Sequence, residues 1–163
     1  MARDAQRAAV YRAEELVRGL FEHAGAGRTV DVLGVSLTLP PEARFASVDA
    51  VQSYADRVLG PGAVRVRARA GAGGAHYESG PAGPVIAVPA GRDGAWALRE
   101  LVVLHELAHH VVAAAGVDGA GIDGAAHGPS FTAAFVDLAA RIMGPEAGLA
   151  LRIVYTESGV AVG

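Results

Sequence analysis

The chain has 163 residues, of which 52% are hydrophobic, so it is long enough and apolar enough to bury a core. Its formal net charge of −3 gives no general attraction to nucleic acid or to an anionic membrane. The absence of cysteine excludes disulfides and thiolate metal sites. We therefore expect one domain over residues 1–163, with no nucleic-acid partner and no membrane partner.

The location of the protein is predicted from two further patterns. The first residues of the sequence are charged and lack the apolar segment of a signal peptide. No stretch approaches the 18 or so uncharged apolar residues of a membrane-spanning helix. We expect a cytoplasmic protein.

The first third of the chain predicts two helices and a strand or hairpin. Apolar residues recur at helical spacing over 3–24, and a glycine-rich segment follows. Residues 29–39 alternate around Gly34, which is typical of a strand or hairpin. Ser47 is placed to cap a helix over 48–59.

Short strands are predicted in the middle of the chain. Residues 64–69 alternate between apolar residues and arginine, and we interpret the three arginines as a solvated strand face rather than a nucleic-acid patch. Two further strands are expected over 75–79 and 85–88. Pro84 and Pro89 flank the second of these, and proline favours sheet edges because it cannot donate to the ladder. We expect residues 85–88 to form an edge, with an interior strand as the alternative.

A helix predicted over about 94–115 carries the most informative motif. It reads His105-Glu106-Leu107-Ala108-His109, within an almost wholly apolar sequence that predicts burial. Two histidines four residues apart lie on one helix face, so both imidazoles can reach one metal ion. Glu106 would lie beside that ion and could accept a proton from a metal-bound water. The competing interpretation is a core helix whose histidines have other partners.

A third ligand is needed, and His127 is the leading candidate. It precedes a helix predicted over about 129–143, in which Pro129 suits the first turn. A glycine-rich loop after residue 115 could return this helix to the motif helix. A capping or surface histidine is the alternative. The carboxylates that compete as third ligand are Asp118, Asp123, Asp137 and Glu146, with Asp137 the strongest of them.

A last, short helix is predicted over 146–157.

The sequences HELAHH and HGPSF together resemble the zincin metallopeptidases of the SprT-like kind. The stretch from VPAGRDGAWALRELVVLHELAHH to ALRIVYTESGV also resembles a small family of predicted actinobacterial metallohydrolases. These resemblances cover about the last 80 residues. They imply that His105, His109 and His127 ligate Zn²⁺ and that Glu106 is the catalytic base. The cysteine-rich zinc ribbon of many SprT-like proteases is absent.

The expected fold is an α+β, zincin-like domain in which a small twisted sheet packs on the helix that carries the motif. The expected function is that of a zinc-dependent hydrolase, most simply a metallopeptidase that acts on a peptide or protein substrate through a zinc-activated water. Hydrolysis of a non-peptide small molecule and a zinc-stabilised binding module with little turnover are the alternatives. The oligomeric state, the substrate and the physiological metal are left open.

Three further residues and one strand are candidates for a role beside the metal. Tyr77 and Tyr155 could each donate to an oxyanion, although core packing is the simpler interpretation of both. His110 could orient Glu106 or could simply pack. Because edge strands beside the metal bind extended peptides in zincins, the resemblance implies that residues 85–88 pair with substrate backbone.

Overall fold

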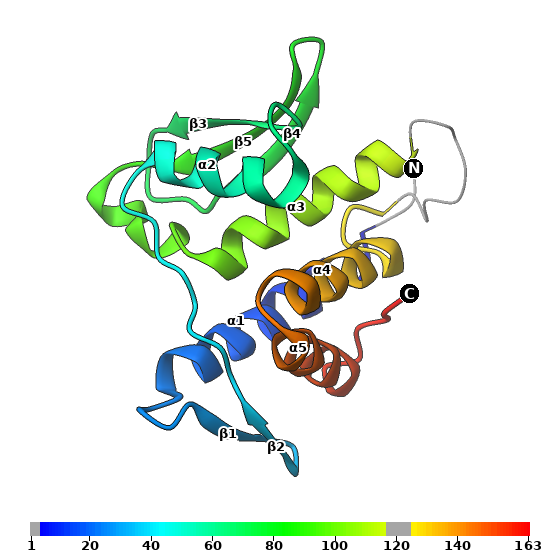
Figure 1. Cartoon of the computed structure of the whole chain (residues 1–163). Helices are drawn as coiled ribbons and strands as arrows, with labels where there is room; N and C mark the ends of the chain where they lie inside the picture. Colours follow the sequence, from blue (N-terminus) through cyan, green and yellow to red (C-terminus); the bar gives the residue numbers. More distant parts are fainter. Residues whose placement is uncertain (1–3, 117–124) are drawn as a thin grey trace. The chain divides into compact units, whose positions relative to one another are not determined.

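The computed structural model describes residues 4–116 and 125–163, and it confirms an α+β fold (Figure 1). The described residues separate into two compact units. The first unit comprises the described residues of the ranges 1–41 and 112–163, and the second comprises residues 42–111. The prediction of a single domain and that of a zincin fold stay predictions.

In its described residues, the first unit contains helices α1, α4 and α5, the end of helix α3 (Glu100–Ala115) and a hairpin. Helix α1 (Arg7–His23), helix α4 (Pro129–Ile142) and helix α5 (Pro145–Glu157) agree with the predicted ranges to within a few residues. Strands β1 (Thr29–Val32) and β2 (Val35–Thr38) pair antiparallel and confirm the hairpin. Its turn places both Leu33 and Gly34 at positive φ, 54° and 85°, which is the backbone of a two-residue hairpin turn.

The core of the first unit lies where α5 contacts both α1 and α4 (Figure 1). Phe131, Phe135 and Tyr155 are among its largest fully buried side chains. A Cβ on Gly148 would lie 2.6 Å from the Cβ of Ala140. Only glycine therefore allows α4 and α5 to pack this closely.

The second unit contains helix α2 (Val48–Leu59), a three-stranded sheet, the 3₁₀ helix η1 (Arg92–Ala97) and most of helix α3 (Glu100–Ala115). Ser47 caps α2 as predicted, because its hydroxyl accepts the N–H of Ala50 at 3.1 Å. The strands are β3 (Arg65–Arg69), β4 (His76–Gly80) and β5 (Gly83–Pro89), in the order β3-β5-β4.

The position of β5 corrects one prediction. Strand β5 pairs with β3 in parallel and with β4 in antiparallel, so residues 85–88 lie at the centre of the sheet. The edge prediction, and the pairing of this strand with substrate, are therefore wrong. Pro84 and Pro89 lie at the strand's ends, where a missing N–H costs little. The four residues between them are buried, as in an interior strand.

The motif helix begins later than predicted, at Glu100 rather than near residue 94. Residues 92–97 form η1 instead. The chain does not continue as one helix from η1 into α3 because residues 98–100 pair with the segment before α2. The carbonyl of Leu98 accepts the N–H of Phe45 at 2.9 Å, and the N–H of Glu100 donates to Ala43 at 2.9 Å. These bonds use backbone groups that a continuous helix would need.

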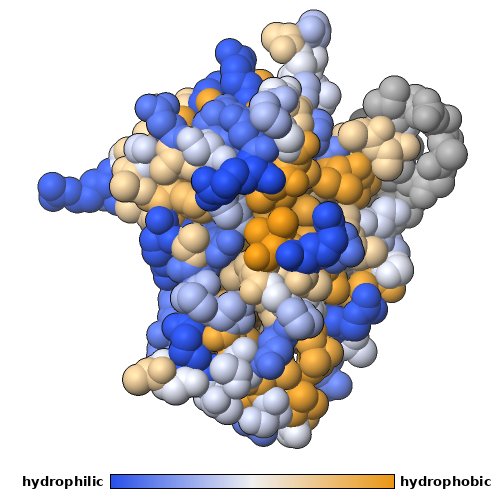
Figure 2. Space-filling view, in the orientation of Figure 1, coloured by the Kyte–Doolittle hydropathy of each residue, from blue (hydrophilic) through white to orange (hydrophobic). Residues whose placement is uncertain are grey.

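On the face drawn in Figure 2, hydrophobic side chains gather in patches between hydrophilic ones. In the first unit the large exposed ones include Leu16, Leu33, Val35 and Leu149. A search of the described helices finds none that combines the length and apolarity needed to cross a membrane.

Candidate metal centre

Helix α3 positions His105 and His109, and its first turn is firmly held. The carboxylate of Glu42 accepts the N–H of Leu101 at 3.1 Å, which satisfies one of the donors that a helix start leaves open. The carboxylate of Glu100 accepts the N–H of Ala43 at 2.9 Å and the hydroxyl of Tyr54 at 2.6 Å. Residues 100–108 are all buried. The pair of histidines therefore lies on a fixed scaffold.

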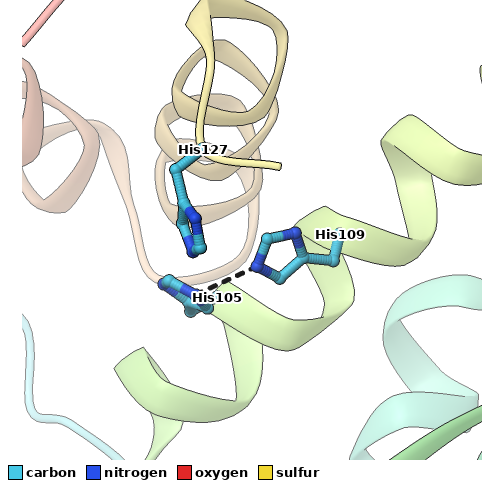
Figure 3. Close-up of side chains that lie close together, drawn as sticks. All are labelled: His105, His109 and His127. Atoms are coloured by element: carbon cyan, nitrogen blue, oxygen red, sulfur yellow. Dashed lines mark hydrogen bonds between the residues drawn. The ribbon is translucent and has the colours of Figure 1, made fainter. Parts of the chain in front are cut away.

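The two histidines of α3 direct the same ring atom toward each other. Their Nε2 atoms are 3.2 Å apart, and the rings meet edge to face at 73° (Figure 3). Two nitrogens bound to one tetrahedral zinc at about 2.0–2.1 Å would lie about 3.3 Å apart. The spacing on α3 therefore fits two ligands of one ion.

His127 lies just before α4, as predicted. Gly128 is the N-cap of α4 and Pro129 occupies its first turn. The segment before α1 holds His127 in place. The His127 Nδ1 atom lies 2.8 Å from Oδ2 of Asp4, and the amide of Gln6 donates to the His127 carbonyl at 2.7 Å. Only 5% of His127 is exposed.

His105, His109 and His127 form a group that could hold a metal ion (Figure 3). Each offers one ring nitrogen, and these ligand atoms all lie within 4.8 Å of one another. His105 and His127 are buried, whereas His109 is partly exposed. The donor set is three imidazoles, which suit zinc and several other transition metals.

Glu106 follows His105 directly on α3 and is 5% exposed. A carboxylate so buried is rare unless it has partners or a chemical task. A carboxylate beside a metal centre could exchange a proton with a ligand of the ion.

The carboxylates that were alternatives to His127 as third ligand do not belong to the three-histidine group in the described part of the chain. Asp137 lies on α4 with 63% of its side chain exposed and pairs with Arg141 at 2.8 Å. The carboxylate of Glu146, on α5, accepts the N–H of Thr38. Asp118 and Asp123, with most of the glycine-rich loop, lie outside the described residues.

The two tyrosines differ in their surroundings. Tyr155 is fully buried, and its hydroxyl donates to Glu14 at 2.6 Å. Burial first, and the neighbouring Glu14 carboxylate second, raise the pKa of Tyr155 well above its usual value. Core packing is therefore the role that its contacts support. Tyr77, on β4, stacks on His109 with ring centroids 6.4 Å apart, so it is the tyrosine near the histidine pair.

His110 contacts Tyr77. Its Nδ1 atom lies 3.3 Å from the Tyr77 hydroxyl, and burial lowers the pKa of His110. The prediction that His110 orients Glu106 stays a prediction.

Asp4 is a site residue that was not predicted from the sequence. The carboxylate of Asp4 meets both the ring and the main-chain N–H of His127, although 123 positions separate the two residues. No local pattern in the sequence marks such a contact.

Comparison of the chain with protein-family models, with curated proteins and with solved structures finds no match. The resemblance to zincins therefore rests on the two histidine motifs alone.

Proposed function

We propose that the protein is a zinc-dependent hydrolase, and most simply a metallopeptidase, in which His105, His109 and His127 hold the ion and Glu106 is the general base. The observation that supports it is the group of three histidine ring nitrogens within 4.8 Å of one another. The substrate would be a peptide or protein.

The donor set agrees with a catalytic rather than a purely structural zinc. Structural zinc sites are closed by four protein ligands, whereas catalytic sites use three and keep a position for water or substrate. When bound, zinc would supply a water acidified to a pKa of about 7 and a positive charge that polarises a carbonyl.

Glu106 would transfer the proton of the attacking water. Its carboxylate would accept the proton of the attacking water and then deliver it to the leaving amine of the peptide. Burial strengthens this role because a charge in a low-dielectric environment interacts more strongly with its neighbours. A metal held for stability alone does not require a carboxylate at this position, so Glu106 favours an enzyme over a binding module.

The test compares the wild type with Glu106→Gln. Each purified protein is loaded with zinc, its metal content is measured, and its turnover is followed on a peptide library by mass spectrometry. We expect about one zinc per chain in both and a 10²–10⁴-fold lower turnover in the variant, the usual contribution of a general base.

Glu15→Gln is the matched control, because Glu15 is exposed on α1. It should leave zinc content and turnover unchanged. Equal turnover by the wild type and Glu106→Gln would remove Glu106 from the mechanism. Failure of the wild type to retain zinc would refute the proposal as a whole.

A further inference from the structure

The setting of His127 assigns a role to the segment before α1. Asp4 uses both carboxylate oxygens on this one residue. Its Oδ2 lies 2.8 Å from the ring Nδ1, and its Oδ1 accepts the main-chain N–H at 3.3 Å. The Asp4 side chain is 25% exposed and that of His127 is 6% exposed. The contact is therefore mostly shielded from water, where a charge-assisted hydrogen bond is stronger.

The plane of the His127 ring is also fixed. The ring of Tyr11 packs against it at a tilt of 55° with centroids 5.1 Å apart, and the ring of Phe131 meets it edge to face at the same separation. These rings limit rotation about the imidazole's bonds. The carboxylate then decides which nitrogen carries the proton, because an ionised carboxylate can only accept a hydrogen bond.

We infer that Asp4 is a positioning residue that holds His127 as the tautomer protonated on Nδ1, so that Nε2 is the atom that ligates the metal. This inference rests on the proposed zinc site. Histidines that bind metals commonly donate their other ring N–H to a carboxylate, which fixes the tautomer and makes the ligating nitrogen more basic. Asp4 supplies that carboxylate from a segment far away in the sequence.

Comparison with Gln6 distinguishes a role of Asp4 at the His127 ring from a role in holding the main chain. Its amide donates to the His127 carbonyl at 2.7 Å, and its side-chain oxygen accepts the N–H of Ala161 at 3.0 Å. Gln6 therefore fixes the same stretch of main chain as Asp4, but it does so through main-chain atoms and not through the His127 ring. A purely structural role for this segment predicts the same effect on the metal from the loss of either side chain.

The first measurement uses metal-free protein labelled with ¹⁵N, at about pH 8, where an ordinary imidazole with a pKa of about 6.5 is neutral. Long-range ¹H–¹⁵N spectra distinguish the protonated ring nitrogen from the unprotonated one. We expect His127 to be protonated on Nδ1 in the wild type and in Gln6→Ala. In Asp4→Ala we expect that preference to be lost. Asp4→Asn keeps the side chain's volume and serves if the alanine variant does not fold.

The second measurement is zinc affinity, by competition with a chromophoric chelator. We expect a 10–100-fold weaker affinity in Asp4→Ala, the usual loss when the partner of a metal-binding histidine is removed. Asp137→Asn is the control, because it removes an exposed aspartate of the same unit. It should bind zinc as the wild type does.

Two results would overturn the inference. One is an Asp4→Ala protein that keeps the wild-type tautomer of His127. The other is a loss of zinc affinity of equal size in Gln6→Ala and Asp4→Ala. If the wild type binds no zinc, the proposed function fails, and the tautomer measurement on metal-free protein still decides the role of Asp4.

Discussion

The histidines of α3 and His127 belong to one group of ligand atoms, but different parts of the chain position them. His105 and His109 are positioned by the repeat of a single helix, four residues apart. His127 is positioned by a carboxylate and an amide that lie 123 and 121 residues away from it in the sequence. The first arrangement is local and the second depends entirely on tertiary structure. A motif in the sequence can specify the first arrangement, whereas only the folded chain provides the second.

The largest expected effect comes from removing the ligands themselves. His105→Ala and His127→Ala should each weaken zinc binding by more than the 10–100-fold typical of losing a ligand's partner, because a metal–nitrogen bond is lost directly. Zinc affinity is measured by chelator competition. If the two variants lose affinity to the same extent, the locally and the remotely positioned histidines are equal as ligands.

His23→Ala is the control for this pair. His23 is exposed on α1, and its ring bonds to the carbonyl of Gly19 within the same helix. It should bind zinc with unchanged affinity. Wild-type affinity in His127→Ala would remove His127 from the ligand set.

A substitution in β5 tests whether the second unit's sheet depends on long-range pairing. Ala87 pairs with Arg67 of β3 and with His76 of β4. Ala87→Pro removes an N–H from the central strand and should lower the free energy of unfolding by at least about 1–3 kcal/mol, the cost of leaving a buried partner unsatisfied. Urea denaturation measures it.

Ser79→Pro is the matched substitution on the edge strand β4, where the residue is exposed. We expect it to cost less than Ala87→Pro, since only one side of β4 is paired. Equal losses would contradict the central position of β5.

The smallest effects should come from two buried tyrosine hydroxyls. Tyr54 donates to Glu100 at 2.6 Å in the second unit, and Tyr155 donates to Glu14 at 2.6 Å in the first. Replacing either with phenylalanine leaves a buried carboxylate short of a donor and should cost about 1–3 kcal/mol. Hydrogen exchange then shows which helices lose stability. We expect Tyr54→Phe to loosen α2 and α3, and Tyr155→Phe to loosen α1 and α5.

Uniform loosening of every α-helix in the described part of the chain, in either variant, would show that the two units unfold together and would contradict this prediction. Thr156→Ala offers a control, because its hydroxyl bonds to Arg152 on an exposed part of α5. It should change exchange rates little.

The predictions that succeeded share a local cause. The ranges of α1, α2, α4 and α5 follow from helical periodicity and from caps such as Ser47. The hairpin follows from alternation around Gly34. The α3 histidine pair follows from a spacing of four. Each of these signals lies within a few residues of the structure it specifies.

The predictions that failed depend on distant partners. Strand β5 has prolines at its ends, as an edge strand would, but β3 and β4 cover both of its sides. Helix α3 begins late because residues 43–45 bond to the backbone just before it. The contact of Asp4 with His127 could not be predicted from the sequence for the same reason. Short-range patterns do not encode which remote segment will supply a hydrogen bond.

The bonds of the segment before α1 also bear on the order in which the protein folds. Gln6 contacts Ala161 across 155 positions, and Asp4 contacts His127 across 123. Closing such long loops costs chain entropy before any contact repays it, whereas a single turn of α3 closes quickly. We therefore expect His105 and His109 to be aligned as soon as α3 forms, and His127 to join them only after the long-range contacts have formed. Metal capture by the complete set would thus report the end of folding rather than initiate it.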